Sequence, residues 1–269
     1  VKPPSLIDRV PNTEAKIELT QLFDVKEGRD TIFYTVKPLG LIKYLIEPFD
    51  EPEAIFLDFF AGSGTTAHAV MELNKEEDID RKFIGVQLPE NCIEKSEAFK
   101  AGYRTIADIA KERIKRAANL IKIDKQKKLD FNPEKKLDLD FKVFKLSDSN
   151  FKLWRQQGIE TVEELEKQME FFTDPISQDA LIDFMVYELL IKSGFDLNCQ
   201  IKHENNIYSV NSNEMILLLE SVSKDIISKV IKTNPQKVVA LDKLFEGNDQ
   251  LKTNTALQMK DADIDFKTI

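Results

Sequence analysis

Cysteine is scarce in this chain of 269 residues, which contains only two. Cys92 and Cys199 lie far apart and match no metal or redox spacing, so we expect free thiols in a reducing cytoplasm. No apolar run is long enough to span a bilayer, and no cleavable leader is visible. The chain starts at Val1 rather than at methionine, which suggests a processed product or a fragment. We therefore expect no metal centre, no disulfide scaffold and no membrane span.

Positive charge is in deficit, because 38 Lys and Arg stand against 47 Asp and Glu, for a net charge of -9. This balance argues against a surface that binds nucleic acid throughout, since phosphate binding needs clustered cations. Between Lys111 and Lys136, however, ten Lys or Arg stand against four Asp or Glu. We interpret this basic segment as a solvated helix face followed by a charged linker, with phosphate contact as the alternative.

The N-terminal half alternates apolar strand patterns with amphipathic helix patterns. Strands are expected at 55–60 and 83–88, and helices at 14–23, 39–46, 65–73 and 103–121. Such alternation predicts an α/β fold with a parallel, doubly wound sheet. The expected organisation is a lead-in segment at 1–30, an α/β part at 31–122, a linker at 123–137 and a smaller α/β domain at 138–269.

The C-terminal half contains α/β patterns without a recognisable catalytic motif. Thr161 and Glu164 form a capping-box pattern that opens a helix, and Gly194 is expected to close another helix at 180–193. Further helices are expected at 224–232 and 253–260. Strands are expected at 141–146, 207–210, 215–219, 238–241 and 264–269.

The most informative motif is a glycine turn that follows the first strand, where residues 58–66 read Asp-Phe-Phe-Ala-Gly-Ser-Gly-Thr-Thr. Two glycines allow a close backbone approach, and the following helix would place its N-terminus over a ligand. No lysine follows Gly64, which argues against a P-loop. A dinucleotide fingerprint is formally satisfied by Gly62, Gly64 and Ala67, but Asp58 would repel a pyrophosphate. The cationic S-adenosylmethionine suits Asp58 better, and a tight turn without a ligand remains the structural alternative.

The same residues resemble a known family. Residues 58–66 look like the cofactor motif of DNA methyltransferases that modify exocyclic amines, and residues 35–42 resemble the T-x-K-P-x-x-L-I segment that precedes it there. The surrounding sequence, including residues 81–90, 102–108 and 245–254, is similar to the modification (Mod) subunit of type III restriction-modification systems. The likeness covers nearly the whole chain, whose order matches the C-terminal part of such a subunit.

This resemblance implies a Rossmann-like, S-adenosylmethionine-dependent half-domain from an enzyme that methylates adenine N6 at a specific DNA site. It also implies a homodimer that works with a restriction (Res) subunit on DNA. Gln87 departs from the family, which usually has Asp or Glu at this position to hold the ribose hydroxyls. Carried over position by position, the expected cofactor residues are Thr35, Lys37, Pro38, Asp58, Phe59, Phe60, Gly62, Ser63, Gly64, Thr65 and Gln87.

The family's catalytic motif, [DNS]-P-P-[YFW], does not occur in these 269 residues. In the family it receives the flipped base and accepts hydrogen bonds from its amine. The resemblance therefore predicts that the catalytic and target-recognition regions belong to an N-terminal half, with no catalytic residue in 1–269. We expect this chain to bind cofactor and to be inactive alone. The alternatives are a non-catalytic assembly or dimerisation module and, less favoured, a dinucleotide-dependent oxidoreductase.

Overall fold

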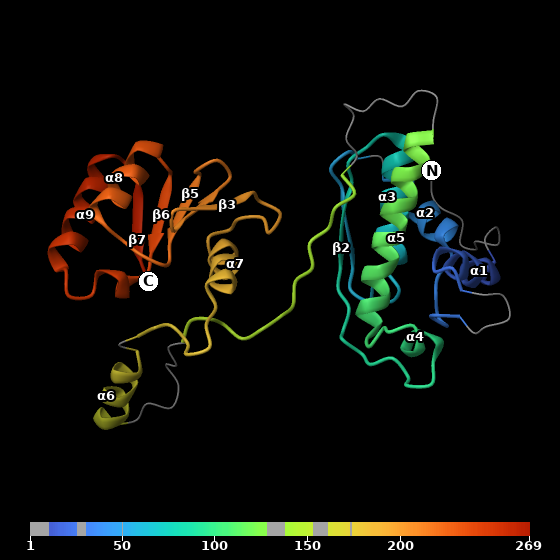
Figure 1. The fold of residues 1–269 in the computed structure, drawn as a ribbon, viewed down its shortest axis with the longest axis horizontal. Coiled ribbons are helices and arrows are strands. Elements are labelled where there is room, and N and C mark those ends of the chain that lie inside the picture. The colour runs from blue at the N-terminus through green and yellow to red at the C-terminus, as the bar shows by residue number, and fades with distance from the viewer. Residues whose placement is uncertain (1–10, 26–30, 50, 128–137, 153–160, 173) are drawn as a thin grey trace. The chain divides into compact units, whose positions relative to one another are not determined.

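The computed structural model describes residues 11–25, 31–49, 51–127, 138–152, 161–172 and 174–269. The chain divides into two compact units, residues 1–141 and 142–269. Both units mix helices with strands, which confirms the α/β prediction (Figure 1). The first unit has a small parallel sheet and the second a larger mixed sheet.

The first unit places two short strands among helices (Figure 1). Its elements in chain order are α1 (Asn12–Leu22), α2 (Leu39–Ile46), β1 (Ile55–Asp58), α3 (Thr65–Glu77), β2 (Lys82–Gly85), α4 (Glu97–Lys100) and α5 (Ile106–Lys127).

Strands β1 and β2 pair in parallel, in register from Ile55 with Lys82 to Asp58 with Gly85. This pairing confirms the predicted parallel geometry. Phe56 and Phe83 lie on one face of the pair and pack against a buried cluster from α2 and α3. Because the strands are parallel, Asp58 and Gly85 end at the same edge of the sheet. The loops that follow both strands therefore meet there.

Helix α1 belongs to the core of the first unit, although the lead-in segment that contains it looks irregular in sequence. Ala15 and Leu19 are fully buried and pack in one cluster with Ile109 of α5. Helix α5 continues to Lys127, so residues 123–127 of the expected linker are helical. Residues 128–137, which make up the rest of that linker, lie outside the described part of the chain.

The second unit is built on five strands in the order β3-β4-β5-β6-β7. The first three pair antiparallel and the last three parallel. Its elements are α6 (Val162–Phe171), α7 (Ile182–Lys192), β3 (Ile201–Glu204), β4 (Ile207–Val210), β5 (Met215–Leu218), α8 (Lys224–Thr233), β6 (Lys237–Ala240), a 3-10 turn (Asp242–Phe245), α9 (Asp249–Asp261) and β7 (Asp265–Thr268).

Side-chain alternation along β5 divides the core of this unit into two layers. Leu217 packs on one face of the sheet with Leu190 of α7. Ile216 packs on the other face with Val230 of α8 and Met259 of α9. The sheet is thus covered by α7 on one side and by α8 and α9 on the other (Figure 1).

The structure corrects two expectations for the second half. Residues 141–146 were expected to form a strand but pair with no strand among the residues that the structure describes, and Leu146 is exposed. Strand β3 was not predicted, because Lys202, His203 and Glu204 give it a polar pattern. The signal for its hairpin is the Asn205-Asn206 pair, whose φ angles of 52° and 64° suit a tight turn between β3 and β4.

Other local predictions hold. Thr161 and Glu164 form the expected capping box at the start of α6, and Gly194 after α7 has a φ of 79°. In the part of the chain that the structure describes, no helix combines the length and apolar character needed to cross a bilayer. The chain start at Val1 and the prolines of its first ten residues lie outside the described residues.

Candidate functional site

The glycine turn connects the end of β1 to the start of α3. Gly62 and Gly64 have φ angles of 53° and 79°, which side chains rarely allow. A Cβ atom at residue 64 would lie 3.2 Å from the backbone oxygen of Ala110 in α5. Gly64 is therefore required both by its backbone conformation and by the close approach of α5.

Asp58 is the last residue of β1, and Gln87 follows the end of β2. Both side chains hold the turn through hydrogen bonds. The Asp58 carboxylate accepts from the Phe60 backbone N–H at 3.0 Å and from the Thr66 hydroxyl at 2.6 Å. Gln87 Oε1 accepts from the Gly62 N–H at 2.8 Å, and its amide nitrogen donates to the backbone oxygen of Leu88 at 3.1 Å. Both side chains thus shape the loop, and a ribose contact by Gln87 stays a prediction.

The upstream segment with Thr35, Lys37 and Pro38 reaches the turn through Phe33. The Phe33 ring lies 3.6 Å from the point where a Cβ atom of Gly62 would be. Thr35 and Lys37 are exposed, and Pro38 is buried directly before α2. The structure thus places Phe33, two residues before the upstream motif, against the glycine turn.

The two phenylalanines of the turn are exposed. Phe60 is 85% exposed and Phe59 64%, while Ser63 and Thr65 are buried. Phe59 and Phe60 thus form an apolar, exposed part of the turn, which we call the lip. Ser63 and Thr65 form a polar, buried part, which we call the floor. The floor is closed by α5, which the sequence analysis did not include in the site.

Arg113 of α5 is a site residue that the sequence analysis missed. It is 1% exposed, and its Nη1 donates to Ser63 Oγ at 3.0 Å and to Thr65 Oγ1 at 2.7 Å. Its Nε lies 3.5 Å from His68 Nδ1. The available signal was the helical spacing from Ala110, which contacts Gly64, to Arg113 one turn later. Arg113 is thus a buried part of the site rather than a solvated charge of the basic segment.

Burial determines the protonation states of Arg113 and His68 beside this floor. It lowers the pKa of Arg113 to about 10, so the guanidinium stays protonated at neutral pH. Burial, and then the positive charge of Arg113, lowers the pKa of His68 to about 3. His68 is therefore a neutral, packed side chain near pH 7.

One face of the β1–β2 sheet is apolar and open. Ile55, Leu57 and Ile84 alternate with the partly buried Phe56 and Phe83, so they point to the opposite face. The apolar series continues beyond the strand ends, and its members are 44% to 64% exposed: Ile55, Leu57, Phe59, Ile84, Val86 and Leu88. We call these six residues the open sheet face.

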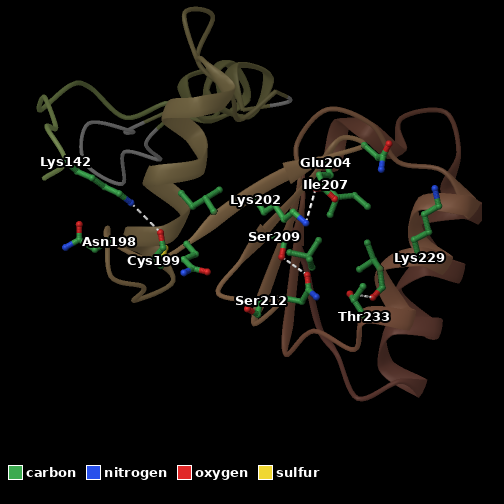
Figure 2. Close-up of a pocket in the computed structure, with 16 residues that line it drawn as sticks. Lys142, Asn198, Cys199, Lys202, Glu204, Ile207, Ser209, Ser212, Lys229 and Thr233 are labelled. Carbon is green, nitrogen blue, oxygen red and sulfur yellow. Dashed lines mark hydrogen bonds and ion pairs between the residues drawn. The ribbon is translucent and has the colours of Figure 1, made fainter. Parts of the chain in front are cut away.

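The second unit contains a separate pocket of about 880 Å³ beside β3, β4 and α8. Figure 2 shows Lys202 paired with Glu204 at 2.9 Å and Lys142 directed to the backbone oxygen of Cys199 at 3.4 Å. None of the residues expected from the sequence to bind cofactor lines this pocket. The candidate site is therefore the glycine turn of the first unit.

Comparison with known proteins finds a match for the segment that contains this turn. Residues 8–100 match the DNA methylase family of N6 and N4 enzymes. This segment is similar to that family. The match contains the glycine turn, the upstream Thr35–Pro38 segment and both strands, and it ends before α5. It favours a methyltransferase over a dinucleotide oxidoreductase.

Individual relatives confirm the resemblance to Mod subunits over about half of this chain, and not over nearly the whole chain as expected. The type III restriction-modification enzyme StyLTI Mod subunit of Salmonella typhimurium is 40% identical over 136 residues, which cover 51% of this chain and 19% of that protein. The EcoP15I Mod subunit of Escherichia coli is 36% identical over 140 residues, again 19% of its length. The type II methyltransferase M.KpnI of Klebsiella pneumoniae is 36% identical over 42% of this chain and 26% of its own length. The chain thus aligns with about a fifth of each Mod subunit.

Proposed function

We propose that this chain is the S-adenosylmethionine-binding part of a type III DNA methyltransferase that acts on adenine N6 at a specific site. The observation that carries the proposal is the position of the glycine turn, between the end of β1 and the start of α3. Ligands of open α/β sheets bind at the carboxyl ends of parallel strands. We also propose that β1 and β2 belong to a Rossmann-like sheet.

The residues of the turn fit this cofactor, which supplies the transferred methyl group. The Asp58 carboxylate has about four acceptor sites, and its two hydrogen bonds within the loop leave the others for an ammonium or a hydroxyl group. Phe59 and Phe60 offer exposed apolar surface at the lip. Lys37, exposed on the adjoining segment, would attract a carboxylate. Together these groups match a ligand with cationic, anionic and aromatic parts.

Calorimetric titration with S-adenosylmethionine tests the proposal. Asp58→Asn keeps the size of the side chain but removes its charge. A charge-assisted hydrogen bond contributes about 1.5–3 kcal/mol, so Kd is expected to rise roughly 10- to 100-fold. Asp80→Asn is the matched control, because Asp80 is exposed and precedes the opposite end of β2. Absence of binding by the unmodified chain would contradict the proposed function.

We further propose that the open sheet face is covered by a catalytic half that lies outside residues 1–269 and carries [DNS]-P-P-[YFW]. Parallel sheets are normally buried on both faces. The exposed Ile55, Leu57 and Ile84 on one face of a two-stranded parallel sheet therefore support a partner that extends or covers it, as do the exposed apolar residues that follow both strands.

A second candidate role is self-association of residues 138–269, for which α6 offers an exposed apolar face. Val162, Leu165 and Met169 share one face of this helix and are 38% to 68% exposed. We propose that a second copy of the chain covers this face, as the homodimer prediction implies. The restriction subunit is the other partner that the resemblance to Mod subunits implies.

Sedimentation equilibrium measures this association. Leu165→Glu is expected to shift a dimer towards the monomer by at least tenfold in dissociation constant, because a carboxylate would be buried without a partner. Glu166→Gln, at the adjacent residue of the same helix, provides the control. A monomeric unmodified chain at micromolar concentration would argue against the role of α6.

A further inference from the structure

Arg113 is a buried cation whose hydrogen-bond partners in the described structure are neutral. Its contacts are the Ser63 and Thr65 hydroxyls and, more weakly, the His68 imidazole. Burying a charge costs several kcal/mol unless hydrogen bonds compensate it. A purely apolar side chain would fill the space without that cost. The cation is therefore best explained by what it does to its partners.

Those partners lie on both sides of Gly64. Ser63 precedes it and Thr65 follows it, while Ala110, one helical turn before Arg113, packs against Gly64 itself. Helix α5 thus meets the turn at three successive residues. Each hydroxyl accepts a hydrogen bond from the guanidinium, so its own hydrogen must point elsewhere. The arginine fixes both the path of the turn and the direction in which its hydroxyls donate.

We propose that Arg113 is a positioning residue that holds the turn at Ser63–Thr65 in the conformation that receives S-adenosylmethionine. This inference rests on the proposed function of the turn. It adds a residue from α5, beyond the 8–100 segment that matches the methylase family.

The test compares Arg113→Lys with Arg116→Lys. Lysine keeps the charge but is shorter, and it lacks the planar guanidinium that places Nη1 between the two hydroxyls. We expect Arg113→Lys to weaken S-adenosylmethionine binding at least tenfold and to accelerate hydrogen exchange at residues 61–66. Arg116 lies on the same helix but bonds to Glu112 and to the backbone oxygen of Leu22, so Arg116→Lys should match the unmodified chain in both measurements. Binding and exchange within twofold of the unmodified chain for Arg113→Lys would overturn the proposal.

A double-mutant cycle separates positioning from general stabilisation. If Arg113 acts through Ser63, adding Ser63→Ala to Arg113→Lys should weaken binding little further, whereas additive losses would overturn the inference.

If Arg113→Lys does not fold, Ser63→Ala and Thr65→Val remove the acceptors instead, and unchanged hydrogen exchange at residues 61–66 in both variants would refute the inference. Should the unmodified chain fail to bind, the proposed function fails, while hydrogen exchange still decides whether Arg113 orders the turn.

Discussion

Methyl transfer to duplex DNA is expected to be undetectable with the isolated chain and to appear once a segment bearing [DNS]-P-P-[YFW] is added. The physical reason is that transfer needs a polar acceptor for the adenine amine and an aromatic stack for the flipped base. These 269 residues contain no such tetrapeptide. The measurement is incorporation of tritium from labelled S-adenosylmethionine into DNA. We expect it to rise from background with the isolated chain to repeated turnover with the added segment.

Two controls make the complementation specific. Replacing the polar first residue of the added tetrapeptide by alanine should abolish incorporation without preventing association. Leu57→Asp on the open sheet face should reduce it strongly, because a carboxylate would be buried in the proposed interface. Ile17→Asp, at a similarly exposed position of α1, should leave incorporation unchanged. Incorporation by the isolated chain would refute the division into a cofactor part and a catalytic part.

Gly64→Ala is expected to destabilise the first unit by more than the roughly 1–3 kcal/mol that a strained backbone residue costs, and to abolish cofactor binding. The new methyl group would meet the backbone oxygen of Ala110 at 3.2 Å, and α5 cannot retreat without disturbing Arg113. The residue would also keep a φ of 79°, which disfavours any side chain. Urea unfolding and calorimetry measure the two effects.

Gly102→Ala is the matched control for Gly64→Ala. Gly102 also has a positive φ, 96°, but no atom lies within 4 Å of its Cβ position. Its substitution therefore carries the backbone penalty alone and should leave S-adenosylmethionine binding unchanged. Equal losses of stability and binding in the two variants would show that the contact with α5 does not matter.

Local patterns predicted most elements of the first unit well. The apolar runs at 55–60 and 83–88 end at turn residues, and the structure has β1 and β2 there. The same reasoning failed at 141–146, where an apolar pattern has no neighbouring strand to pair with, and at β3, whose polar residues pair with β4. A strand requires a partner, and a single segment does not specify one.

The sequence by itself determined the motif order, the glycine turn and the relation to type III Mod subunits, because these depend on residues that are close together along the chain. Only the tertiary structure decided that Arg113, 50 residues after Ser63, is buried beside the floor of that turn rather than exposed as a surface charge. It also decided that one face of the β1–β2 sheet is open. Burial and hydrogen bonding are properties of packed neighbours, so a side chain that is charged in sequence acquires its role only when the chain folds around it.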